Sequence, residues 1–351
     1  MTNKCGITTG TTAAGAAKAA AISLTGNLCP DTVSVTLPNG EDRNVLIERS
    51  ANGQATAIKD AGDDPDVTNG LRITASIQFA CRAVGASCSS NSLDNVIVKG
   101  GKGIGIVTKA GLQVPVGSHA INPVPTQMIK QAVRQILPHG GLIVEISVPE
   151  GERIAKKTFN ERLGIIGGIS IIGTTGIVTP MSLEAIKATI RCEIDVAAAN
   201  QDIKILYLSP GKIGESALRE KIGCLTVVQM SNYIGHALSY VKEKGIEEIV
   251  IGGHPGKLAK LTMGYWDTHS GNSPQAVNYV TEFIGIKNKK FNTVEEIIES
   301  LYNGGAERNF TDLAKEIAET IINKFGFKHV NVYLFDMKKR TIGESVCTRY
   351  I

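Results

Sequence analysis

The stretch that most constrains the fold lies near the middle of the chain, where residues 163–183 carry no charge. A run of this length could cross a membrane, but five glycines, several hydroxyl side chains and Pro180 interrupt it, and no basic cluster marks a membrane face. The pattern instead predicts a short buried strand at Ile169–Ile172, a tight loop at Gly173–Gly176, and a helix that begins at Met181 or Ser182.

A glycine loop between a buried strand and a helix presents backbone N–H groups to an anionic or polar ligand. The same glycines could instead serve only to permit a sharp turn against a sheet. The pattern leaves both interpretations open. The candidates for cofactor binding in this loop are Gly173, Thr174, Thr175 and Gly176.

The length of 351 residues favours two domains. Up to residue 151, predicted strands cluster with few helices, which is typical of an α+β domain. In that half we expect Thr11 or Thr12 to cap an alanine-rich helix, and Asn95–Val98 to form a hairpin with Ile104–Thr108. From residue 152 to 351, strands alternate with helices, which predicts an α/β domain with a mainly parallel sheet. We expect the boundary near Gly151.

Three loops follow predicted strands of the second half: Gly173–Gly176, Ser209–Gly214 and Gly252–Lys257. Because ligands bind beyond the carboxyl ends of the strands in an open parallel sheet, we expect the three loops to line one crevice. Ser209 and Gly211 therefore join the candidates for cofactor binding. Common nucleotide fingerprints do not fit, since Leu258 follows Gly256-Lys257 where a phosphate loop requires Ser or Thr.

Charged residues gather at the start of the next predicted helix, where His254, Lys257 and Lys260 fall three residues apart. Two lysines and an imidazole at a helix N-terminus suit a carboxylate, but a solvated helix face has the same spacing, and both interpretations stay open. His269 follows in an Asp-Thr-His-Ser run. His254 and His269 lack a third metal ligand, so we predict no metal site built by the protein.

Acidic residues crowd a polar turn at Asp63, Asp64 and Asp66. They are interpreted either as turn formers that accept backbone N–H bonds or as groups that orient a ligand. Both interpretations are compatible with the sequence of the turn.

Composition excludes several classes of protein. A net charge of +4 without a dense basic run, and an aromatic content of 5%, disfavour a nucleic-acid platform. The seven cysteines include no CxxC pair, and no signal peptide is recognisable. We therefore expect a reduced, cytoplasmic protein with no membrane partner. The sequence does not decide between a monomer and a homo-oligomer.

With these residues laid out, the chain resembles the cobalt-precorrin-5B C(1)-methyltransferases of anaerobic cobalamin biosynthesis. The resemblance extends from Gly6 to about Ser270 and depends on several blocks in order. It departs from the family pattern at Thr12, Asn69, Thr126 and Lys212. The blocks are Gly6-Ile-Thr-Thr-Gly-Thr, residues 59–68, residues 117–125, Ala155-Lys-Lys-Thr-Phe-Asn, residues 164–182, Ser231-Asn-Tyr-Ile-Gly, residues 256–261 and Thr268-His-Ser.

The resemblance implies S-adenosyl-L-methionine as methyl donor and a cobalt corrinoid as small-molecule substrate, with cobalt already inside the macrocycle. It also implies an N-terminal α+β domain and a C-terminal Rossmann-like domain. His254 becomes the candidate general base. The candidates for binding the acidic macrocycle are Thr8, Thr9, Thr11, Asp63, Asp64, Lys257, Lys260 and His269.

Two other functions remain as alternatives. The first is a non-catalytic binder of a corrinoid or another polyanionic metabolite. The second is a nicotinamide-dependent oxidoreductase, which the missing glycine fingerprint and the missing ribose-binding acid disfavour.

Overall fold

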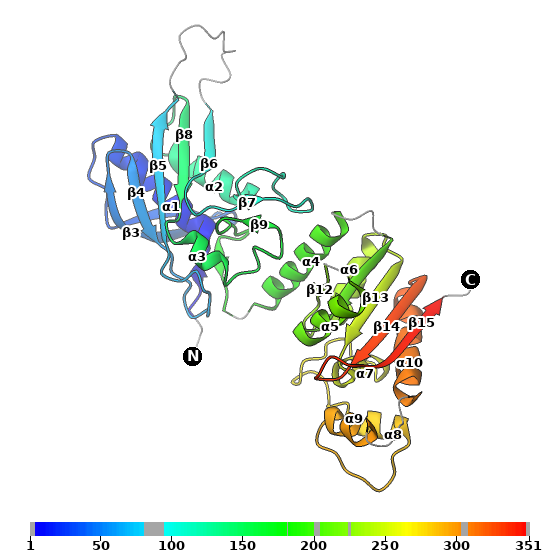
Figure 1. The fold of residues 1–351 in the computed structure, drawn as a ribbon. Helices are drawn as coiled ribbons and strands as arrows, with labels where there is room; N and C mark the ends of the chain where they lie inside the picture. The colour runs from blue at the N-terminus through cyan, green and yellow to red at the C-terminus, as the bar shows by residue number, and fades with distance from the viewer. Residues whose placement is uncertain are drawn as a thin grey trace. The chain divides into compact units, whose positions relative to one another are not determined.

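The computed structural model describes residues 4–80, 95–180, 182–199, 204–223, 226–302 and 308–348. Contacts divide the chain into two compact units, Met1–Leu183 (unit 1) and Glu184–Ile351 (unit 2). Each unit has its own large sheet and its own hydrophobic core (Figure 1). The expected mixture of helices and strands is therefore confirmed.

Unit 1 is built on a sheet whose described strands follow the order β2-β3-β4-β5-β8-β6. Neighbouring strands are antiparallel, except that β6 runs parallel to β8. Apolar residues alternate with polar residues in β2 and β5 because one face of each strand is buried. The strands are β2 (Thr32–Thr36), β3 (Asp42–Ala51), β4 (Gln54–Ile58), β5 (Arg72–Phe79), β6 (Val96–Gly100) and β8 (Leu142–Ser147).

The hairpin expected between residues 95 and 108 is wrong. The first segment, β6, pairs with β8, while β7 (Ile106–Val107) pairs with β9 (Ile165–Ile166). Gly103, at φ +76°, turns the chain onto the backbone of Val148, so close that a Cβ atom would lie 1.8 Å from the Val148 oxygen. This turn directs β7 away from β6.

Helix α1 (Thr9–Leu24) packs against strands β2 to β5 of this sheet and against α2 (Pro123–Arg134). Seven alanines of α1 have no exposed surface, which explains a helix rich in small residues at the centre of a core. Thr8, and not Thr11 or Thr12 as expected, is the N-cap residue: its side chain accepts from the Thr11 N–H. A short helix, α3 (Gly151–Ala155), follows β8.

The uncharged stretch forms turns and short pairings up to residue 180. β10 (Ile177–Val178) pairs antiparallel with β1 (Gly6–Ile7) at the start of the chain. The strand expected at Ile169–Ile172 is wrong, because Ile169 and Ile171 form only isolated bridges, to Ile104 and Ile121. No helix among the described residues is long and apolar enough to cross a membrane.

Unit 2 is built on a sheet whose described strands follow the order β12-β11-β13-β14-β15. The first four strands run parallel, and β15 lies antiparallel to β14 at the edge. The strands are β11 (Ile205–Ser209), β12 (Val228–Gln229), β13 (Glu248–Gly253), β14 (His329–Phe335) and β15 (Thr341–Thr348).

Helices cover both faces of this sheet. Leu218 of α5 packs with Val250 and Phe335 on one face, while α4, α6, α7 and α10 contribute to a larger core on the other face. The helices are α4 (Leu183–Ala199), α5 (Lys212–Ile222), α6 (Ile234–Glu243), α7 (Pro255–Thr262), α8 (Val277–Ile284), α9 (Val294–Tyr302) and α10 (Arg308–Phe325).

The two units divide between Leu183 and Glu184, whereas the sequence analysis expected a boundary near Gly151. Residues 152–183 belong to unit 1 because β9 pairs with β7 and β10 pairs with β1. The pairing partners lie far away along the chain, so no local pattern indicates them.

Candidate functional site

The threonines before and in the first turn of α1 are the first group of predicted site residues. Thr9 Oγ1 donates to the carbonyl oxygens of Ser170 and Ile172 at 3.3 Å each, and it accepts from the Ile172 N–H at 2.9 Å. Thr11 Oγ1 donates to the Gly176 oxygen at 2.7 Å. Thr8, Thr9 and Thr11 are all buried. The hydroxyl groups of Thr9 and Thr11 therefore hold residues 170–176 against the start of α1, while the Thr8 hydroxyl caps the helix.

The glycine loop at residues 173–176 closely contacts the same threonines. A Cβ atom on Gly173, at φ +135°, would lie 2.3 Å from Thr8 Oγ1. One on Gly176, at φ +82°, would lie 2.6 Å from Leu37 Cδ2 and 3.0 Å from Thr11 Oγ1. Thr175 Oγ1 lies within hydrogen-bonding distance of its own loop, at Ile177. Close packing against Thr8, Thr11 and Leu37 thus explains both glycines.

The acidic turn lies beside β1 in the same unit. The exposed Asp63 carboxylate accepts from the Lys4 backbone N–H at 2.6 Å, and Ile7 donates its N–H to the Asp60 oxygen. Asp64, partly buried, donates its N–H to the Ala61 oxygen. These contacts are those of a turn former.

A buried ion pair anchors this turn. Lys59, with 1% of its side chain exposed, lies 2.7 Å from the Asp66 carboxylate. Burial raises the pKa of Asp66, but the hydrogen bonds from Lys59 and Thr68 outweigh it, and the net shift is downward. The carboxylate is held charged because it accepts hydrogen bonds from the Lys59 ammonium and from Thr68.

The second group of predicted residues lies where the parallel strands of unit 2 end. β12, the next strand along the chain after β11, lies on one side of β11. The strand after that, β13, lies on the other side of β11. In parallel sheets such a switch point opens a crevice beyond the carboxyl ends of the two strands. Ser209 to Gly211 follow β11, and His254 follows β13. We call this place the switch point.

Gly211 stands directly before α5 at the switch point. Its φ of −177° is extended, and no atom lies within 4 Å of the position that a Cβ would occupy. The preceding Ser209 hydroxyl donates to the Gly211 oxygen at 2.9 Å and fixes the turn. Helix geometry leaves the first N–H groups of α5 without intrahelical acceptors, and this end of the helix carries a partial positive charge. The open space beside Gly211 lies directly in front of it.

The rest of α5 is packed tightly on the sheet. A Cβ atom on Gly214 would lie 2.5 Å from the Gly252 oxygen and 2.6 Å from Ser209 Oγ. One on Gly253 would lie 2.9 Å from Pro210 Cγ. Lys257 of α7 donates from Nζ to the Pro210 oxygen at 3.3 Å and joins the two loops. The loops after β11 and β13 are therefore in contact with each other at one edge of the sheet.

His254 uses both of its ring nitrogens within the fold. Nδ1 accepts from the Gly256 N–H at 3.0 Å and caps α7, so the neutral ring carries its proton on Nε2. That nitrogen lies 3.0 Å from the Glu295 carboxylate. The ring is therefore held as a helix cap with an acidic partner.

The two lysines of α7 differ in their surroundings. Lys260 is buried and donates to the Thr268 oxygen at 3.1 Å and to Ser273 Oγ at 2.9 Å, so it fixes the loop after α7. Burial, and then the charge of Lys260, lower the pKa of Lys257. His269 is exposed, and its Nδ1 accepts from the Gly271 N–H at 3.1 Å.

The structure regroups the predicted residues. It joins Gly173 and Gly176, expected to bind the cofactor, with Thr8, Thr9 and Thr11, expected to bind the substrate. It also joins Pro210, which lies between Ser209 and Gly211, with Lys257 of α7. The expectation that three loops follow strands of one sheet is wrong, because residues 173–176 lie in unit 1.

Sequence reasoning missed the acidic residues near the switch point. Glu215 of α5 accepts from the Gln229 side chain, and Glu193 of α4 accepts from the Gln229 N–H at 3.1 Å. Both glutamates are buried. Each lies on a different helix, so only the fold brings them to the end of β12. Among the described residues, no group of three or more His, Cys, Asp or Glu side chains could hold a metal ion.

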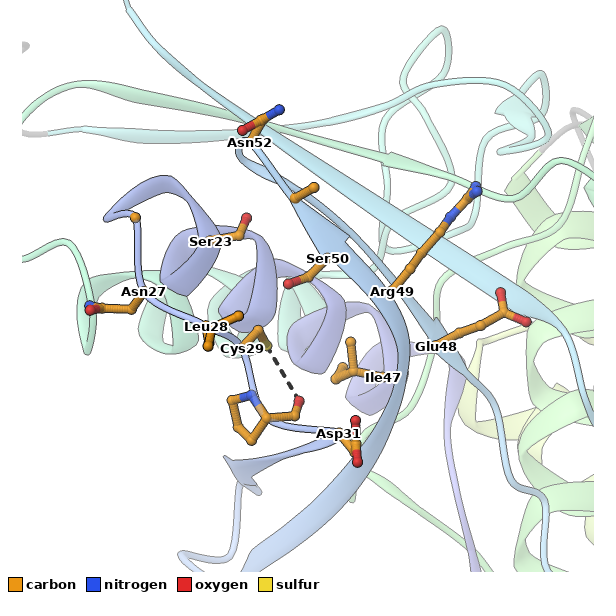
Figure 2. A pocket seen from close by; sticks show the side chains of 13 residues that line it. Ser23, Asn27, Leu28, Cys29, Asp31, Ile47, Glu48, Arg49, Ser50 and Asn52 are labelled. Atoms are coloured by element: carbon orange, nitrogen blue, oxygen red, sulfur yellow. Dashed lines mark hydrogen bonds between the residues drawn. The ribbon is translucent and has the colours of Figure 1, made fainter.

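Unit 1 has a hollow of about 380 Å³. It is lined by Ser23, residues 26–31 and residues 47–52 (Figure 2). Ser23 lies near the end of α1, whereas Thr9 begins it. At 1.5 Å per residue the two positions are about 20 Å apart along the helix. None of the predicted site residues lines this hollow, so we do not assign it to the candidate site.

Comparison with known proteins gave concordant matches. The family described as CbiD matches residues 1–180. Proteins named cobalt-precorrin-5B C(1)-methyltransferase match from Desulfitobacterium hafniense (41% identity, 84% of this chain, 75% of the relative), Moorella thermoacetica (46%, 76%, 71%) and Methanocaldococcus jannaschii (36%, 98%, 97%). A crystal structure of a cobalamin biosynthesis protein from Archaeoglobus fulgidus has 31% identity over 77% of this chain and 83% of that chain, with a TM-score of 0.41.

Proposed function

The chain belongs to the cobalt-precorrin-5B C(1)-methyltransferase family, and we propose that it methylates C-1 of cobalt-precorrin-5B to give cobalt-precorrin-6A in anaerobic cobalamin biosynthesis. The methyl donor in this proposal is S-adenosyl-L-methionine. Relatives with this name match the chain over most of their own length, which supports the assignment of the whole activity to it.

The donor binds, in this proposal, at the switch point of unit 2, where parallel strands with helices on both faces support a Rossmann-like layout. The observation that carries this assignment is the open space at Gly211 in front of α5. The carboxylate of the donor would meet the free N–H groups of that helix. The residues fit such a group because the loop is shaped by Ser209 and walled by Pro210 and Gly253.

Bound S-adenosyl-L-methionine supplies an electrophilic methyl group on a sulfonium. The protein has to align this methyl group with C-1 of the macrocycle and exclude water, and neither task requires a protein nucleophile. The tight packing of Gly214 on Gly252 makes the edge rigid, which suits alignment.

In this proposal His254 holds the start of α7 in place. Its Nδ1 fixes the start of α7 by accepting from the Gly256 N–H, and its Nε2–H donates to the Glu295 carboxylate. To accept a proton from the substrate, the ring would first have to release the cap. Lys257, whose ammonium lies beside the switch point at the Pro210 oxygen, is the candidate cation for a substrate carboxylate in this proposal.

The test is methyl transfer together with donor binding. The purified protein, given cobalt-precorrin-5B and S-adenosyl-L-methionine, should yield the methylated corrinoid and S-adenosylhomocysteine, followed by mass spectrometry. Binding of S-adenosylhomocysteine without transfer to the corrinoid would contradict the proposed reaction. Corrinoid binding without any heat from S-adenosylhomocysteine would favour the non-catalytic binder.

Graded substitution at Gly211 tests the donor assignment. Gly211→Ala and Gly211→Val keep an extended backbone that any residue adopts, but they fill the open space progressively. We expect affinity for S-adenosylhomocysteine to fall in that order, by about tenfold or more for valine, at an unchanged melting temperature. Unchanged affinity in both variants would move the donor away from the switch point.

A further inference from the structure

Two helices of unit 2 bring basic side chains toward the edge of the sheet where the parallel strands end. α4 precedes β11 and runs back along it, so the N-terminal half of α4 lies toward that edge. α6 follows β12 and begins at the same edge. α4 and α6 share the larger core of the unit (Figure 1). Lys187 and Arg191 lie on α4, and His236 lies in the first turn of α6.

Arg191 is held in place by two contacts. Its Nε donates to His236 Nε2 at 3.3 Å, and its guanidinium carbon lies 5.5 Å from the centre of the Tyr240 ring. The Tyr240 hydroxyl donates to the Asp195 carboxylate at 3.0 Å, which fixes the ring. The same carboxylate pairs with Lys244 at 2.5 Å. The fork of Arg191 is therefore oriented before any ligand arrives.

The terminal nitrogens of Arg191 have no carboxylate partner among the residues that the structure describes, and the side chain is exposed. Lys187 stands one turn earlier on the same helix, with its ammonium 3.1 Å from the largely exposed Glu184. An oriented guanidinium without a carboxylate is suited to bidentate binding of an incoming one.

His236 serves this arrangement as a neutral acceptor. Because Nε2 accepts from Arg191, it carries no proton. Burial, and then the charges of Arg191 and Lys187, lower the pKa of His236, while Glu184 acts in the opposite direction. The imidazole therefore orients the guanidinium without adding a competing charge at neutral pH.

We propose that Arg191 and Lys187, with Arg191 oriented by His236 and Tyr240, form a carboxylate-binding subsite for the acidic side arms of the macrocyclic substrate. This inference rests on the proposed function. The exposed side chain of Leu183, four residues before Lys187 and on the same face of α4, gives the apolar ring system a surface to contact. Cationic and apolar groups on one helix match a flat macrocycle with carboxylates at its rim.

No stretch of sequence indicates this subsite. Arg191 and His236 are 45 residues apart, and each alone resembles an ordinary surface residue. The fold brings them together because α4 and α6 cover the same face of the sheet.

The experiment compares two cobalt corrinoids as probes: cobyrinic acid, which carries carboxylates, and cobinamide, in which they are amides. Binding to the full chain is measured by visible absorbance. We expect Arg191→Ala to weaken cobyrinic acid binding about tenfold or more and to leave cobinamide binding unchanged. Arg191→Lys should recover only part of the affinity, because a point charge does not replace a fork. Lys187→Ala should weaken binding less.

The matched control is Lys315→Ala on α10, which removes the same charge from an exposed site. Equal weakening by Lys315→Ala and Arg191→Ala would reduce the effect to net charge and overturn the subsite. Cobyrinic acid binding that is unaffected by Arg191→Ala, or absent in the parent, would also overturn it.

Turnover separates this inference from the proposed function. If the parent transfers methyl groups and Arg191→Ala leaves KM for the corrinoid unchanged, the subsite is wrong and the function stands. If the parent transfers none and Arg191→Ala still weakens only cobyrinic acid, the subsite stands without the reaction. Thermal unfolding of each variant establishes that it is folded.

Discussion

Two helix N-termini, one in each unit, look alike in sequence and differ in structure. In unit 1 the start of α1 is surrounded by threonines whose hydroxyl groups bond to residues 170–176. In unit 2 the start of α5 is preceded by Gly211 with open space around it. The first arrangement is closed by the protein itself, and the second is open to a ligand.

The difference between the two helix starts shows that a motif of glycine and hydroxyl residues can have two structural uses. Hydroxyls and glycines before a helix can cradle a ligand or clamp another segment of the same chain. The partners of Thr9 lie more than 160 residues away, so the sequence around Thr9 does not distinguish the two uses. The distinguishing observation is whether the hydroxyls already have partners.

The largest expected loss of stability comes from removing the buried ion pair between Lys59 and Asp66 in unit 1. Asp66→Ala leaves the Lys59 ammonium buried and unpaired, which should cost about 3 kcal/mol or more of unfolding free energy. The exposed pair of Glu41 with Arg43 is the control, and Glu41→Ala should cost less than about 1 kcal/mol. Chemical denaturation of unit 1 measures both.

The same substitution changes acid sensitivity. Because the pKa of Asp66 is lowered in the folded protein, its stabilisation is present above its unfolded pKa and is lost as the pH falls through the folded pKa. The variant should therefore lose less stability than the parent on acidification. A parallel loss in both proteins would contradict the role of this carboxylate.

A second prediction separates packing from ligand binding at Gly173. Gly173→Ala places a Cβ atom against Thr8 at a positive φ, which should cost about 3 kcal/mol through overlap and backbone strain. Affinity for S-adenosylhomocysteine should stay at the parental value in the folded variant. A large loss of donor affinity at unchanged stability would make residues 173–176 a donor loop.

A third prediction tests whether the Thr11 hydroxyl serves stability or substrate binding. Thr11→Val keeps the shape of the side chain but removes the donor to the Gly176 oxygen, which should cost about 1–2 kcal/mol. Thermal unfolding measures the loss, and corrinoid binding is the comparator. Weaker corrinoid binding without a change in melting temperature would show that this hydroxyl serves the substrate.

The smallest expected effect concerns Lys257 at the open edge. Because burial lowers the pKa of Lys257 in the folded protein, the charged form is disfavoured there at neutral pH. The penalty should be relieved as the pH rises through the folded pKa toward the unfolded value, so parental stability should gain relative to Lys257→Met in that alkaline range. Denaturation curves of parent and variant between neutral and alkaline pH test this, and parallel curves would contradict it.

The sequence predicted what depends on near neighbours. Alternating residues indicated β2 and β5, and strand–helix alternation indicated the parallel strands β11, β13 and β14. It did not predict that β6 pairs with β8 or that β10 returns to β1, because those partners are selected by tertiary packing. The sequence predicted the same role for Lys257 and Lys260. In the structure Lys260 is buried and bonds to the loop after α7, whereas Lys257 is only partly buried and bonds to the Pro210 oxygen.

The pairing of β1 with β10 has a consequence for how the chain is made. Residues 6–11 bond to residues 172–178, so the first element of the protein is completed by a segment synthesised much later. At 5–20 residues per second, roughly ten to thirty seconds of translation separate them. During that time the N-terminal end of the alanine-rich α1 lacks its bonds to residues 172–176. A nascent chain stalled soon after residue 151 should remain open to protease, whereas one whose residue 183 has left the exit tunnel should close.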